Sequence, residues 1–136
     1  MSTDQMLATD IDAIAECFQH LGLAVEIAEV SSNTKGIRAS TSGIPFSAFL
    51  FQNEEQKSPY LMLSCMLPGR KASLEWVNNW NNRFPLTRAS LNDEGEAMLT
   101  QSVILTGITA AHVKEVVSWW DLLLRIFVED LLAIQG

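Results

Sequence analysis

The sequence is poor in the residues that most catalytic and metal centres use. Its 136 residues include only two histidines, His20 and His112, and two cysteines, Cys17 and Cys65. Neither histidine belongs to an HExxH, HxxxE or HxH motif, and the cysteines form no CxxC pair, so no set of metal ligands is indicated. We therefore expect no metal and no cofactor, and we interpret both cysteines as buried free thiols.

Other absences narrow the possible functions further. No apolar run reaches the ~18 residues that span a bilayer, and the acidic N-terminus lacks the basic and apolar regions of a signal peptide. No GxSxG, GxGxxG or GxxxxGK[ST] motif is present, which argues against a nucleophile elbow or a phosphate-binding loop. The net charge of −7, from 16 acids and 9 bases, disfavours nucleic acid and anionic membranes as partners. We expect a cytoplasmic protein.

The composition that remains is that of a globular protein. Apolar residues make up 48% of the chain and charged residues 18%, and the length fits a single domain over residues 1–136. Four bases fall in one stretch, Arg70, Lys71, Arg83 and Arg88, with a single acid among them. This stretch is either a solvated helix end or a docking patch for an acidic partner segment.

The hydrophobic pattern predicts helices and short strands. Apolar residues recur at helical spacing in residues 4–21, 71–84 and 110–134. Strand-like segments fall at 25–30, 36–43, 44–52, 60–67, 86–92 and 97–105. Segment 60–67 is apolar almost throughout, which is typical of a central strand covered on both faces. Because short strands joined by turns favour an antiparallel sheet, we predict an α+β fold of about five strands and three helices, in the order α-β-β-β-α-β-β-α.

Turn and cap residues set the expected ends of these elements. Gly22 is placed to end the first helix and Pro85 to stop the second. Thr109 can cap the last helix through its hydroxyl. The pair Pro68-Gly69 is expected to end the central strand, and the acidic turn DEGE is expected to join the last two strands as a hairpin.

The stretch WVNNWNNRF concentrates tryptophan and asparagine on the second predicted helix. Trp76 and Trp80 lie one turn apart on the same side, which favours hydrophobic anchors over an aromatic ligand cage. Asn78 and Asn81 fall toward this side, whereas Asn79 points to solvent. We predict that Asn78 and Asn81 hydrogen-bond the backbone of an adjoining strand or loop, and so clasp the helix to the sheet.

The last predicted helix has more apolar surface than one core contact needs. One broad face can supply that contact through Val113, Val116, Val117, Trp120, Leu123, Leu124, Phe127, Leu131 and Ile134. A flank outside this face carries Trp119, Leu122, Ile126 and Ala133. The flank either packs on the first helix or a loop, or it forms a partner or self-association surface.

Several of these features occur together in a known family. They are Val77, Asn78, Trp80, Asn81 and Phe84 on the second helix, the hairpin LTRASLNDEGEAMLTQSVIL, and a last helix rich in Trp, Leu and Phe. On these features the sequence resembles the YbjN-like proteins, a bacterial group described as sensory transduction regulators. The resemblance implies a fold like that of the type III secretion chaperones, an antiparallel sheet with three helices that commonly forms a dimer.

Three hypotheses for function remain open at this point. The first is a non-enzymatic, chaperone-like or regulatory module that forms a homodimer and binds a protein or peptide through an apolar helix or sheet surface. Its candidate anchors are Trp76, Trp80, Trp119, Leu122 and Ile126. The second is a small-molecule-binding regulator with a pocket between the sheet and the Trp-bearing helix. The third is an enzyme, which requires polar side chains such as Glu75, Arg83 or Arg88 to converge in a cleft.

Overall fold

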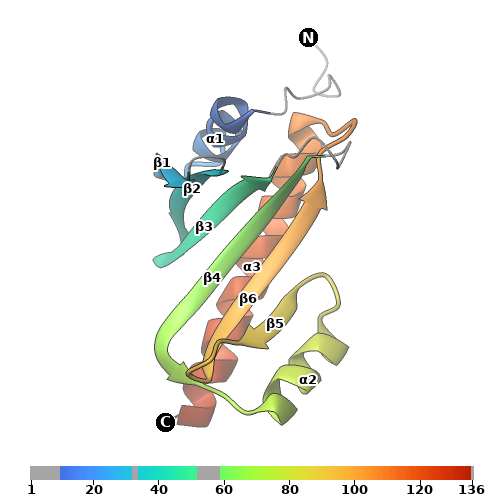
Figure 1. The fold of residues 1–136 in the computed structure, drawn as a ribbon. Helices are drawn as coiled ribbons and strands as arrows, with labels where there is room; N and C mark the ends of the chain where they lie inside the picture. The colour runs from blue at the N-terminus through green and yellow to red at the C-terminus, as the bar shows by residue number, and fades with distance from the viewer. Residues whose placement is uncertain (1–9, 32–33, 52–58, 136) are drawn as a thin grey trace.

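Six antiparallel strands form one sheet in the computed structural model, which describes residues 10–31, 34–51 and 59–135. The elements are α1 (Ile11–His20), β1 (Val25–Ser31), β2 (Thr34–Thr41), β3 (Ile44–Phe51), β4 (Tyr60–Lys71), α2 (Leu74–Arg83), β5 (Arg88–Leu91), β6 (Glu96–Ile104) and α3 (Ala110–Gln135). The spatial order is β1-β2-β3-β4-β6-β5 (Figure 1). The α+β prediction is confirmed, with six strands rather than about five, because four strands instead of three lie between α1 and α2.

Local hydrogen bonds fix the ends of the helices. The Asp10 side chain accepts from the Ala13 amide at 2.8 Å and starts α1, and Gly22, with φ +85°, ends it as predicted. Residues 4–9 of the predicted first helix lie outside the described residues. Ser73 caps α2 by accepting from the Trp76 amide at 3.1 Å, and Thr109 caps α3 by accepting from the His112 amide at 3.1 Å. Each cap satisfies an amide that has no partner inside its helix.

The core lies between the sheet and the helices, which all pack on the same face. Phe46 of β3 contacts Phe18 of α1 and Trp120 of α3, with ring centroids 6.2 and 5.8 Å apart. Phe127 of α3 contacts Trp80 of α2 at 5.0 Å. With its 26 residues, α3 is about 39 Å long and runs along β4 and β6 behind the sheet in Figure 1. We call this covered side the inner face and the opposite side the outer face.

The apolar face predicted for α3 is buried along most of its length. Val113, Val117, Trp120 and Leu124 are all at most 3% exposed against the inner face. Ile134 was predicted to share this face, but it is 53% exposed. It lies in the last turn of a helix that ends at Gln135. The core covers this face of α3 as far as Leu131, which is 1% exposed, and does not extend to Ile134.

Strand β4 continues past Pro68-Gly69, where the sequence predicted its end. The pairing with β6 shifts register between Met66 and Lys71, and Gly69 adopts φ +76° there. The Gly69 amide donates to the Glu96 carboxylate. This bond, followed by one from Asn92, holds the pKa of Glu96 below its ordinary value. A Pro-Gly pair therefore forms a bulge here, because glycine tolerates the left-handed conformation and the strand resumes at Lys71.

The two edges of the sheet differ. β5 has four residues, and α2 packs beside it. β1 has seven residues, and its outermost side chains include the exposed Glu26, Ile27 and Glu29. No helix among the described residues is long and apolar enough to cross a membrane.

Candidate functional site

The outer face of the sheet has no helix over it in the described part of the chain. Along β3 the side chains alternate, with Phe46, Ala48 and Leu50 buried on the inner face and Ser47 and Phe49 half-buried on the outer face. The outer face is rich in large apolar side chains, which are Phe49, Phe51, Tyr60, Met62, Met66, Met98 and Ile104. A monomer rarely leaves so many large apolar side chains on one uncovered face without a use for them.

Strand β4 shows the imbalance between the two faces most clearly. Leu61, Leu63 and Cys65 point inward and are at most 2% exposed. Met62 is half-buried and Met66 is 45% exposed on the outer face. The sequence predicted a central strand covered on both sides. β4 is central, but the described helices cover only its inner side. A strand that is apolar on both sides is normally buried on both.

A single row of side chains crosses the middle of the outer face. Register places Glu26, Arg38, Ser47, Ser64, Thr100 and Arg88 directly opposite one another, one from each strand. The hydroxyls of the three central strands thus separate two apolar areas. The area toward the start of β4 includes Phe51 and Tyr60, whose ring centroids lie 4.9 Å apart in a stacked arrangement. The area toward the end of β4 includes Met66 and Met98, which are opposite each other in the β4–β6 pairing.

A second exposed surface lies on the side of α3 away from the sheet. We call it the outward stripe, and it consists of the exposed residues Ala111, Glu115, Ser118, Leu122, Arg125 and Glu129. Trp119 lies on its flank and is 45% exposed, and Leu122 is 40% exposed. Ile126, predicted to belong to the same flank, is partly buried against the core. Lys114, Glu115, Ser118, Trp119 and Leu122 line a shallow hollow here.

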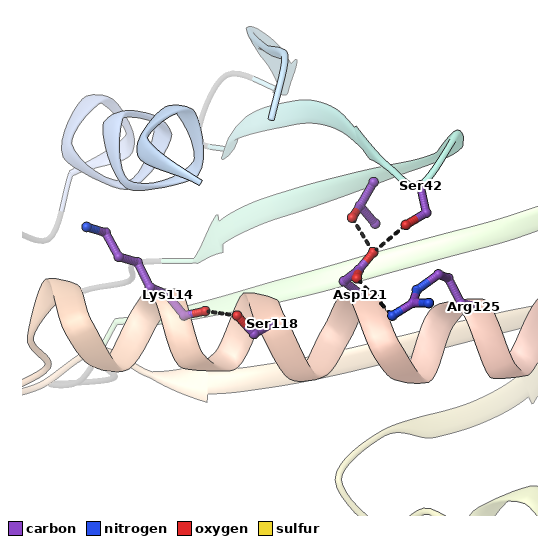
Figure 2. A network of polar contacts seen from close by, with 6 residues as sticks. Ser42, Lys114, Ser118, Asp121 and Arg125 are labelled. Carbon is purple, nitrogen blue, oxygen red and sulfur yellow. Dashed lines mark hydrogen bonds and ion pairs between the residues drawn. The ribbon is translucent and has the colours of Figure 1, made fainter. Parts of the chain in front are cut away.

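Asp121 ties this part of α3 to the β2–β3 turn (Figure 2). One carboxylate oxygen accepts from the Thr41 hydroxyl, and also from the Ser42 hydroxyl at 3.0 Å. The other oxygen lies 3.4 Å from an Arg125 guanidinium nitrogen. Ser42 has φ +52°, which is strained for a residue other than glycine, and the bond to Asp121 helps to hold it. The ion pair orients Arg125 on the outward stripe.

The two tryptophans of α2 serve the core. Trp80 was predicted as a possible partner contact, but it is 1% exposed, and its indole N–H donates to the Thr87 hydroxyl at 3.0 Å. Trp76 is partly buried and packs on Phe127, with ring centroids 5.2 Å apart. Trp80 therefore cannot contact a partner while the domain is folded. The sequence pattern could not separate core from interface because both need the same apolar stripe.

Asn81 joins α2 to β5 through both ends of its amide. Its Nδ2 donates to the Ala89 carbonyl at 3.1 Å, and its Oδ1 accepts from the Ala89 amide at 2.7 Å. Asn78, predicted to share this role, is exposed and has no side-chain hydrogen bond to any described residue. It lies one turn before Asn81 on α2 and does not reach the β5 backbone, so only Asn81 clasps the helix.

Replacing Asn81 by Ala is expected to lower the free energy of unfolding by about 1–3 kcal/mol. The change leaves both the amide and the carbonyl of Ala89 without a partner beside the buried core. Asn79→Ala is the matched control, because Asn79 is exposed on the same helix, and it should be nearly neutral. Urea unfolding of the two variants measures the difference, and equal midpoints would contradict the role of Asn81.

The polar residues that the sequence offered for an enzyme site, Glu75, Arg83 and Arg88, do not converge in the structure. No group of three His, Cys, Asp or Glu side chains among the described residues could hold a metal. Burial raises the pKa of the Cys65 thiol to about 11, which makes it a poor nucleophile. Glu75, Arg83 and Arg88 are exposed and share no hydrogen bond or ion pair, and Arg83 instead lies 3.4 Å from Asp130. On the inner side of α2, Trp76 and Trp80 pack against Phe127 of α3.

Comparison with known proteins gives one family match. The profile of the YbjN family, described as "Putative bacterial sensory transduction regulator", matches residues 10–133. No curated protein matches the chain. The matched range runs from the cap of α1 to the last turn of α3, and so it includes both exposed surfaces.

Proposed function

Because the chain belongs to the YbjN family, we propose that it is a bacterial cytoplasmic regulatory module that binds a protein partner and performs no catalysis. The partner surface is the outer face of the sheet. The single observation that carries this proposal is β4, which is apolar on both sides but covered by the described helices on one side only. A bound partner supplies the missing layer.

Burial on the outer face offers enough free energy for specific recognition. Phe49, Met62 and Met66 retain accessible apolar surface, and each Å² of it that a partner covers contributes about 25 cal/mol. Methionine adapts its shape to different partners, whereas stacked rings such as Phe51 and Tyr60 offer a rigid contact. We further propose a chaperone-like mode of binding, because the element order matches the fold that the family resemblance implies.

A photo-crosslinking amino acid at Met62 tests this proposal in the native cell. We expect a discrete crosslinked protein from position 62, and none from position Glu16, an exposed residue of α1 on the other side of the molecule. Adding Met62→Asp to a capture experiment should remove the same protein from the bound fraction. Equal crosslinking at both positions, or none at either, would contradict the assignment of the outer face.

The same protein is proposed to be a homodimer through the outward stripe of α3. We place two copies of α3 antiparallel, with the two-fold axis level with residue 120. A residue that precedes position 120 by some number of residues then faces the residue of the second copy that follows position 120 by the same number. Ser118 then faces Leu122 of the second copy, and Glu115 faces its Arg125. A small side chain thus meets a large one and an acid meets a base. This arrangement covers Leu122 and Trp119 and leaves the outer face open.

A further inference from the structure

Two arginines lie on the outer face without a described ionic partner. Arg38 on β2 and Arg88 on β5 are both exposed, and neither forms an ion pair with any residue that the structure describes. Glu26 stands directly opposite Arg38 on β1, yet no ion pair joins them. On a chain of net charge −7, the central row of this face therefore presents two available positive charges beside apolar surface.

The positions of these arginines define the width of a binding site. β2 and β5 are each two strands away from β4, so the backbones that carry Arg38 and Arg88 are about 19 Å apart. Along β4, the outward side chains from Tyr60 to Met66 extend over about 20 Å. A helix of about 13 residues matches that length. Its width of about 10 Å leaves each arginine within side-chain reach of one flank of the helix.

We propose that the partner segment is an amphipathic α-helix that lies along β4 and carries carboxylates on both flanks of its apolar stripe. This inference rests on the proposed function and specifies its partner. The stripe packs on Met62 and Met66, while flanking Asp or Glu residues pair with Arg38 and Arg88. α3 packs along the strands of the inner face in the same way (Figure 1), so the complex has three layers.

Two other partners fit this surface less well. A single-stranded nucleic acid could stack on Phe51 and Tyr60, but two arginines on an acidic protein neutralise little of a phosphate backbone. An added strand needs an open sheet edge, whereas these residues lie across the face of the sheet. The helix uses the apolar side chains along β4 and both charges together.

Three labelled peptides of about 14 residues, long enough for this site, test the proposal. They share one Leu/Phe stripe at helical spacing and differ only in having Glu, Gln or Lys on both flanks. With the full chain, fluorescence anisotropy should show the Glu peptide binding about 10-fold more tightly than the Lys peptide. High salt should reduce this preference, because the arginines are exposed. The double variant Arg38→Glu/Arg88→Glu should reverse it.

Controls locate the effect on the outer face. Arg83→Glu makes the same charge reversal at one position on α2, with half the change in net charge of the double variant, and it should leave the preference unchanged. Met62→Asp should remove binding of the Glu peptide. Binding that ignores flank charge, a preference that survives the double variant, or no binding of any peptide would overturn the inference. So would binding of a labelled single-stranded RNA that the double variant loses.

Different experimental outcomes would contradict the proposed function and this inference. If crosslinking at Met62 captures a partner whose contact segment is not an acid-flanked helix, the outer face remains the binding surface and only the partner class is wrong. If crosslinking at Met62 captures nothing while the Glu peptide still binds with the expected charge preference, the surface accepts such helices, but the cellular role proposed above is wrong.

Discussion

Trp80→Ala is expected to destabilise the protein by about 3–5 kcal/mol, the usual cost of removing a buried tryptophan. The side chain is 1% exposed, and its ring lies 4.2 Å from the ring of Phe84 and 5.0 Å from that of Phe127. The variant leaves a cavity where α2, α3 and the β5 region meet, and it also removes the donor to Thr87. Because folded domains are stable by about 5–15 kcal/mol, this single change consumes much of the total.

Urea unfolding followed by circular dichroism measures this loss, since the variant also removes a fluorophore. Leu74→Ala is the control on the same helix, because Leu74 is 72% exposed, and it should shift stability by no more than about 0.5 kcal/mol. Trp80→Phe separates packing from hydrogen bonding, since it retains a ring without the indole N–H. A loss below about 1 kcal/mol in Trp80→Ala would contradict a core role and would return this residue to the interface candidates.

The double variant Trp119→Glu/Leu122→Glu is expected to convert the proposed dimer into a folded monomer. Four carboxylates would enter one interface, and an uncompensated buried charge costs about 3–5 kcal/mol. The dissociation constant should therefore rise more than ~100-fold. Light scattering coupled to size exclusion measures the mass, and circular dichroism checks the fold. Ile134→Glu is the control, because Ile134 is exposed on α3 but lies outside the outward stripe.

A charge swap tests the two-fold axis itself. Glu115→Arg alone and Arg125→Glu alone each place like charges opposite one another across the axis and should weaken the dimer. The combined variant restores opposite charges, so it should recover most of the affinity. If the wild-type protein is a monomer at all concentrations, or if the combined variant is weaker than both single ones, the proposed register is wrong.

Sequence patterns predicted the helices well because amphipathic spacing is a local property. The face of α3 that includes Val117, Trp120 and Leu124 follows directly from the helical repeat. The ends were less predictable. The sequence predicted that Pro68-Gly69 ends the strand, but the pair forms a bulge. The Gly69 amide there donates to Glu96, a residue of β6 that no pattern local to β4 could indicate. Ile134 fits the helical spacing of the buried face, but it is exposed because the core does not extend to the last turn of α3.

The candidate surfaces depended on information that no local pattern contains. The alternation along β3 placed Ser47 and Phe49 on the same face, but nothing in the sequence aligned Ser47 with Arg38 and Arg88. That row exists only because register is continuous across the strands. Likewise, the apolar run of β4 indicated two covered faces, and only the three-dimensional arrangement revealed that the described helices all pack on one of them.

The charged edge of the sheet has a consequence for solubility at high concentration. Among the described residues no strand pairs with the outer side of β1, and exposed Ile27 makes that edge attractive to another strand. Glu26 and Glu29 stand on either side of Ile27. Stacking such edges in register would bring these carboxylates from neighbouring chains together, and their repulsion opposes strand-by-strand growth into fibres. These two glutamates therefore lower the risk of edge-to-edge aggregation in a protein whose outer face we propose as a partner surface.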